Sequence, residues 1–192
     1  GTYVADGNRA YYIYELTWEG RTQTGVAAVC SVDEYEDGTI KRHELTREDK
    51  ERDRIEHMRA LGCQTGPIFT TYRDQPVLDV IVEAAKTATP LYDFTDDEGV
   101  RQRVWEVARP DAVEAIHAMF EQVPCAYIAD GHHRTASAVK VVQAMRAEAH
   151  AAGTLTGTEP FNYYLSVLFP ASQITILPYN RVVSDRAGMD VG

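Results

Sequence analysis

The sequence has few cysteines and no long hydrophobic run. Its three cysteines, Cys30, Cys63 and Cys125, stand far apart, which argues against a closed disulfide framework and against the paired spacing of a zinc or redox site. We interpret each as a small buried apolar side chain in a reducing cytosol. The chain also lacks the roughly 20 consecutive apolar residues of a membrane span and the pattern of a signal peptide. We therefore expect a soluble, cytoplasmic protein without a membrane partner.

Positive charge is scarce as well. The formal net charge is -10 and the pI is near 5.0, which disfavours a large basic surface for nucleic acid but allows a local positive pocket. The composition, 44% hydrophobic and 25% charged, is that of a globular protein, and we predict one domain over residues 1–192. The chain starts at Gly1 within strand-like sequence and stops at Gly192 without an evident structural ending. We therefore expect a longer protein truncated at both ends; the sequence does not indicate its oligomeric state.

The first part of the chain reads as antiparallel strands. Residues 11–18 and 25–32 are rich in aromatic and β-branched residues, and 19–22 between them predicts a hairpin connection. The Asp-Gly pair at 37–38 favours a second tight turn, which leads into a strand over 40–43.

The rest of the chain alternates helices and strands. We predict four helices, the first capped by Thr46 and stopped by Gly62, over 47–61, 77–86, 111–122 and 133–149. Further strands are predicted over 67–72, 103–107, 125–129, 161–169 and 174–177, with loops at 93–99 and 152–160. This mixture of hairpins and β-α units predicts an α+β fold with a mixed, largely antiparallel sheet.

One segment carries the residue types of an anion site. Asp130-Gly131-His132-His133-Arg134 stands where an apolar strand ends and a helix begins, and such a helix end presents unpaired N–H groups and a positive dipole. Gly131 lets the backbone approach a ligand, Arg134 can donate two hydrogen bonds to a phosphate, and the histidines add further donors. We predict that Gly131 to Arg134 bind phosphate.

Simpler roles exist for the same residues. Asp130 can cap the helix, the histidines can be packed or solvent-facing, and Arg134 can pair only with a nearby carboxylate. Adjacent histidines do not converge easily on one ion, and no supporting Cys or spaced His lies near them, so zinc binding is disfavoured.

The segment Tyr127-Ile128-Ala129-Asp130-Gly131-His132-His133-Arg134 closely resembles the signature of a bacterial and archaeal family catalogued as domain of unknown function 1015. The resemblance continues, in the family's order, through 32–35, 40–47, 53–54 and 176–183. It covers essentially the whole chain. Members of that family are longer, which agrees with a truncated piece.

The resemblance implies a fold and a chemistry. The family's central region is similar to ParB-type nucleotide switches, sulfiredoxin and free-serine kinases, in which a Gly-to-Arg turn before a helix holds nucleotide phosphates. It therefore implies a ParB/sulfiredoxin-like core and phosphoryl transfer with Mg²⁺. ATP, ADP and pyrophosphate all remain open as donors, and Asp130 would hold the metal.

Within this resemblance, Glu44 becomes the candidate general base, because kinases that act on a hydroxyl need a carboxylate to take its proton. Asp130 and His133 complete the expected catalytic set, and His43, Arg47 and Arg181 would bind substrate. Glu44 can equally be a capping or ion-paired glutamate. Similarly, Arg47 and Arg54 can have the simpler role of pairing with Glu51 on the same helix.

Two functions follow. The first is a small-molecule kinase that phosphorylates the hydroxyl of free L-serine, an acceptor that rests on the resemblance alone. The alternative is a ParB-like nucleotide-binding regulatory module without kinase activity, which needs no base at Glu44. A third reading is a fragment whose fold persists without activity.

Overall fold

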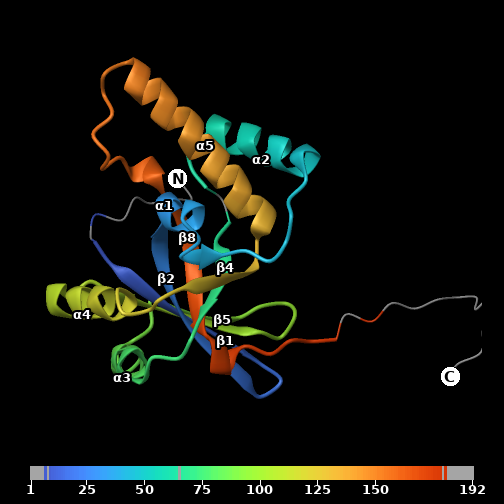
Figure 1. The fold of residues 1–192 in the computed structure, drawn as a ribbon. Helices are drawn as coiled ribbons and strands as arrows, with labels where there is room; N and C mark the ends of the chain where they lie inside the picture. Colours follow the sequence, from blue (N-terminus) through green and yellow to red (C-terminus); the bar gives the residue numbers. More distant parts are fainter. Residues whose placement is uncertain (1–6, 8, 65, 179, 181–192) are drawn as a thin grey trace, which may run out of the picture.

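A computed structural model describes residues 7, 9–64, 66–178 and 180 (Figure 1). The described chain forms an α+β fold with one eight-stranded sheet and five α-helices. The strands are β1 Tyr11–Trp18, β2 Arg21–Ser31, β3 Ile40–Lys41, β4 Ile68–Tyr72, β5 Tyr92–Thr95, β6 Arg101–Val107, β7 Ala126–Asp130 and β8 Tyr163–Pro170. The helices are α1 Val32–Glu36, α2 Glu48–Leu61, α3 Pro76–Ala85, α4 Pro110–Phe120 and α5 His132–Ala151, with 3-10 turns at Pro160–Asn162 and Ala171–Gln173.

The sheet is mixed and mostly antiparallel, with the order β3-β7-β4-β8-β2-β1-β6-β5. Only the β3/β7 and β4/β8 pairs run parallel in the described sheet. Helices α2 and α5 pack side by side near the β3-β7-β4 end of the sheet (Figure 1). Helices α3 and α4 contact each other near the remaining strands, at the lower left of Figure 1. No helix within the described ranges is both long and apolar enough to cross a membrane.

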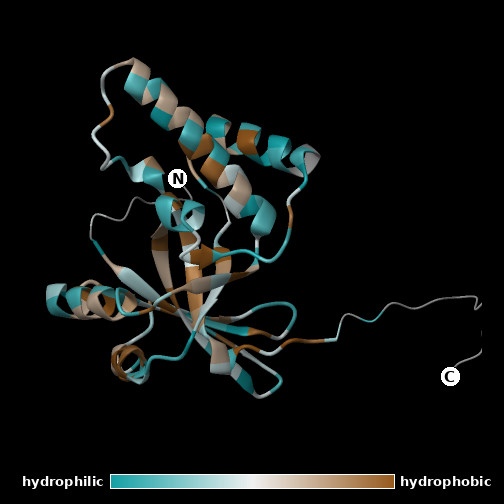
Figure 2. Ribbon diagram, viewed as in Figure 1, coloured by the Kyte–Doolittle hydropathy of each residue, from teal (hydrophilic) through white to brown (hydrophobic). Residues whose placement is uncertain are grey.

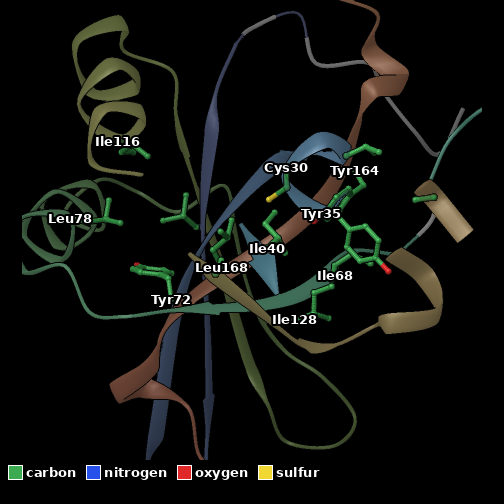
Figure 3. Packing of buried hydrophobic residues seen from close by; sticks show 14 of the residues in the cluster. Cys30, Tyr35, Ile40, Ile68, Tyr72, Leu78, Ile116, Ile128, Tyr164 and Leu168 are labelled. Atoms are coloured by element: carbon green, nitrogen blue, oxygen red, sulfur yellow. The ribbon is translucent and has the colours of Figure 1, made fainter. Parts of the chain in front are cut away.

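The core lies between the sheet and its helices. Figure 2 shows hydrophobic residues gathered on the central strands and on α3, with hydrophilic residues interspersed along α2, α4 and α5. In β4, alternate residues are buried, as expected for a strand with one face on the core. Figure 3 shows Ile68 of β4 and Ile128 of β7 in a cluster that also receives Leu78 of α3 and Ile116 of α4, and all four side chains are fully buried.

Most predicted elements are confirmed within a few residues, but four details were wrong. A helix, α1, replaces the predicted end of the second strand because the Ser31 hydroxyl accepts a hydrogen bond from the Asp33 N–H and starts a helical turn. Part of the predicted loop at 93–99 is β5, which pairs with β6. Residues 174–177 form no strand. The cap of α2 is Arg47, whereas the Thr46 side chain hydrogen-bonds to Glu51.

Helices α2 and α5 are joined by two ion pairs of different burial. Lys140 Nζ lies 2.6 Å from Glu51 Oε2, and the Glu51 side chain is 2% exposed. Arg59 Nη2 lies 2.9 Å from Glu148 Oε1 with both side chains largely exposed. Burial would raise the pKa of Glu51, but hydrogen bonds from Lys140 and Thr46 outweigh it, and the pKa is lowered.

We expect removal of these two ion pairs to lower the free energy of unfolding by different amounts. Lys140→Met should lower the free energy of unfolding because it leaves the buried Glu51 carboxylate without its cation. Arg59→Met removes only a solvent-screened pair and should change stability by less than about 1 kcal/mol. Urea unfolding at neutral pH compares them, and equal losses in the two variants would contradict the stabilising role given to the Lys140 pair.

Candidate functional site

The candidate site lies at the carboxyl end of β7, where the sheet order brings two other connections. Strand β3 runs parallel to β7, so the chain leaves β3 at the same end. Strand β4 runs antiparallel to β7, so the chain enters β4 at that end. The turn after β7 is therefore flanked by residues 42–47 on one side and by residues 62–67, of which 65 is not described, on the other.

The turn itself has the geometry that the sequence predicted. Gly131 has a φ of 97° and is the N-cap of α5, so the helix begins at His132, one residue earlier than expected. Asp130 is therefore not the N-cap. Its Oδ2 accepts a hydrogen bond from Arg134 Nη2 at 2.8 Å, which folds the guanidinium back over the turn. The first N–H groups of α5 have no acceptor within the helix, so they are free to bind an anion at this end.

Gly131 is required for two separate reasons, which a pair of variants separates. A side chain at Gly131 would be strained by the positive φ, and its Cβ would also lie 2.9 Å from Arg134 Nη2. A side chain at Gly38 would be strained only by the positive φ of 84°. Both Gly131→Ala and Gly38→Ala should lose about 1–2 kcal/mol of stability in urea unfolding. Only Gly131→Ala should also weaken anion binding measured by calorimetry. Unchanged anion affinity in Gly131→Ala would contradict the close fit of Arg134.

On the β3 side, His132 contacts the candidate base, Glu44, and its neighbour His43. Its side chain is buried, and Nδ1 lies 3.3 Å from Glu44 Oε2. The ring of His43 packs edge-on against the ring of His132, with centroids 4.4 Å apart. Glu44 itself remains 59% exposed, so a ligand can reach its carboxylate. The structure thus brings Glu44 and His43 to the first residue of α5.

The connection that carries Glu44 is held at both ends. Before it, Arg42 Nη1 donates a hydrogen bond to the Tyr35 hydroxyl at 2.9 Å and the guanidinium lies over the Tyr35 ring. After it, the Arg47 N–H reaches His133 Nδ1 at 3.5 Å, a long hydrogen bond. These contacts fix the loop against α1 and α5, and they position Glu44 without using its own carboxylate.

His132 is held neutral. Burial lowers its pKa, with His43 as the second cause, and the nearby carboxylates only partly oppose this. His132 Nε2 is buried and has no hydrogen-bond partner within the described ranges.

This pKa predicts a pH dependence of stability. In the unfolded chain His132 binds a proton below about pH 6.5. In the folded chain it binds that proton only at a lower pH, because its pKa is lowered. The free energy of unfolding should therefore rise with pH across that window, by about 1.4 kcal/mol for each tenfold difference in proton affinity. Urea unfolding at several pH values should show a weaker rise in His132→Gln. Equal slopes in the variant and the wild type would contradict the assignment.

On the β4 side, a pocket of about 280 Å³ opens beside Arg134. A Cβ at Gly66 would lie 3.4 Å from Arg134 Cδ, so this glycine forms part of the wall against which the arginine packs. Seven of the described residues line the pocket: Asp53, Arg54, His57, Met58, Gln64, Gly66 and Arg134. The guanidinium of Arg134 therefore borders both the turn and the pocket.

The structure places most of the predicted site residues together. Asp130 to Arg134, His43, Glu44 and Arg47 converge at the end of β7, and Arg54 lines the adjacent pocket. Arg181 lies outside the described residues. Sequence reasoning missed His57, Met58, Gln64 and Gly66. Gln64 and Gly66 stand just before a predicted strand, whereas His57 and Met58 lie on the helix predicted over 47–61. Neither position reveals which strand lies beside it.

The described residues contain no group of three or more His, Cys, Asp or Glu side chains arranged to hold a metal ion. Among the described residues, two exposed carboxylates, Asp130 and Glu44, stand at the turn. Such a site suits Mg²⁺, which commonly binds one or two carboxylates together with phosphate oxygens and water.

The chain belongs to the family described as "Protein of unknown function (DUF1015)", whose profile matches residues 1–191. This confirms the resemblance seen in the segment that ends at Arg134. No curated protein and no solved structure matches the chain.

Proposed function

We propose that this protein is a small-molecule kinase that phosphorylates a hydroxyl group, with free L-serine as the first acceptor to test. The proposal includes a ParB/sulfiredoxin-like core, and the Gly-to-Arg turn at the start of α5 supports it. The donor is a nucleotide or pyrophosphate whose phosphates bind at that turn.

The contact between Glu44 and His132 carries the proposal. A carboxylate that is 59% exposed stands 3.3 Å from the first residue of a helix whose amino end suits an anion. Charge repulsion makes a carboxylate beside bound phosphate unfavourable, so a carboxylate at this position calls for a specific role. Proton removal from an acceptor hydroxyl is such a task, and it needs the carboxylate beside the transferred phosphoryl group.

In the proposed reaction, the acceptor hydroxyl gives its proton to Glu44 while its oxygen forms a bond to the terminal phosphorus. The bond from that phosphorus to its bridging oxygen breaks, and the leaving phosphate keeps the electron pair. We assign His132 the role of a positioning residue because its Nδ1 lies 3.3 Å from one carboxylate oxygen of Glu44. As a neutral ring it orients the carboxylate without cancelling its charge.

The phosphates would be held by backbone N–H groups of His132 and His133 and by the guanidinium of Arg134. Arg134 keeps its hydrogen bond to Asp130 through Nη2, which fixes the plane of the guanidinium. Bound Mg²⁺ would neutralise phosphate charge, and Asp130 would hold it. His43 and Arg47 border Glu44 and would contact the acceptor, together with Arg181.

A product assay tests the proposal. The full-length protein is incubated with Mg²⁺, with ATP, ADP or pyrophosphate, and with serine, threonine or homoserine, and phosphorylated products are sought by mass spectrometry. We expect one donor and one acceptor to give a product that requires both. Donor binding without product from any acceptor would reject the kinase and favour a ParB-like regulatory module.

A further inference from the structure

The pocket beside Arg134 has no role in the transfer step described above. None of its lining residues is Glu44, His43 or Asp130, because these lie at the turn or on its β3 side. The pocket lies on the β4 side and shares Arg134 with the turn. A ligand whose phosphates contact Arg134 can therefore extend into the pocket in the direction away from the candidate base.

Two buried nitrogen atoms at the pocket have no hydrogen-bond partner within the part of the chain that the structure describes. They are Gln64 Nε2 and Arg134 Nε. The Gln64 amide is fixed, since its Oε1 accepts a hydrogen bond from the Leu165 N–H at 2.6 Å. Buried donors without an acceptor are costly, so a ligand that supplies acceptors here would gain affinity.

We infer that this pocket receives the nucleoside of the phosphoryl donor, an inference that rests on the proposed function. The Met58 thioether offers a polarisable surface for the face of a base, and Gln64 Nε2 offers a donor for its edge. The Asp53 carboxylate can accept hydrogen bonds from sugar hydroxyls. The donor is accordingly a nucleotide rather than pyrophosphate.

The size of the pocket agrees with this ligand class. A volume of about 280 Å³ equals the share of about nine water molecules in the liquid. That space would be left open by a pyrophosphate bound at the turn, whereas a bicyclic base would fill much of it. The acceptor would stay on the opposite side of the turn, next to Glu44.

Filling the pocket tests the inference. His57 is an exposed lining residue of α2, so His57→Trp should occupy the pocket while the fold is kept. Ala60→Trp introduces the same side chain at an exposed position of α2 that does not line the pocket. Calorimetry measures the affinity of each full-length protein for ADP and for pyrophosphate with Mg²⁺, and for serine.

The wild type and Ala60→Trp should bind ADP at least about tenfold more tightly than pyrophosphate. In His57→Trp the ADP affinity should fall to that of pyrophosphate, while pyrophosphate affinity stays unchanged and shows that the turn is intact. The inference is overturned by equal ADP and pyrophosphate affinity in the wild type, by ADP affinity that survives His57→Trp, or by loss of serine binding alone. Absence of binding by both anions would instead reject the proposed function, and the inference with it.

Discussion

Glu44→Gln should abolish most phosphoryl transfer while leaving donor binding intact. The amide keeps the size of the side chain but cannot accept the acceptor's proton, and loss of a general base costs about a hundred- to ten-thousandfold in turnover. Because the phosphates bind at the turn, donor affinity should change by less than about threefold. Steady-state kinetics and calorimetry on the same preparation measure both quantities.

The matched control for this variant is Glu56→Gln, an exposed glutamate on α2 outside the turn and the adjacent pocket. It should retain wild-type turnover and affinity. If Glu44→Gln turns over as fast as the wild type, Glu44 is only an ion-paired partner of His132, and the base must be sought elsewhere.

Arg134→Ala should produce the opposite pattern, with the donor affinity as the main loss. Removal of a charge-assisted contact to phosphate should weaken donor binding by about ten- to a hundredfold. Arg134→Lys should recover part of this loss, because lysine keeps the charge but not the planar pair of donors. Calorimetry with ADP and Mg²⁺ measures the series, and Arg101→Ala, which removes an exposed pair with Asp93, is the control.

The same series separates ligand binding from the simpler role of Arg134. If the arginine serves only Asp130, then Arg134→Ala and Asp130→Asn should lower stability to a similar extent and leave donor affinity unchanged. That outcome would remove Arg134 from the phosphate site.

The sequence was most informative where local physics decides the structure. The apolar strand followed by Gly131 predicted the turn before α5, because only a residue without a side chain tolerates a φ of 97° beside the Arg134 guanidinium. The Asp-Gly pair at 37–38 predicted its turn in the same way. Such features need no knowledge of distant segments.

Long-range pairing could not be predicted in this way. The residues at 174–177 look like a strand, but β8 is already paired on both sides, with β4 and β2. Likewise, Gln64 and Gly66 become part of the site only because β4 lies between β7 and β8. The contact of Glu44 with His132 depends on the parallel pairing of β3 with β7, whereas the prediction of Glu44 came from the family resemblance.

The most direct test of the central claim is a crystal structure of the full-length protein with Mg²⁺, a non-hydrolysable nucleotide and serine. The donor phosphates should contact the first N–H groups of α5 and the guanidinium of Arg134. The serine hydroxyl should lie within hydrogen-bond distance of Glu44. Phosphates bound away from the turn at Gly131, or a serine hydroxyl remote from Glu44, would contradict the proposed site.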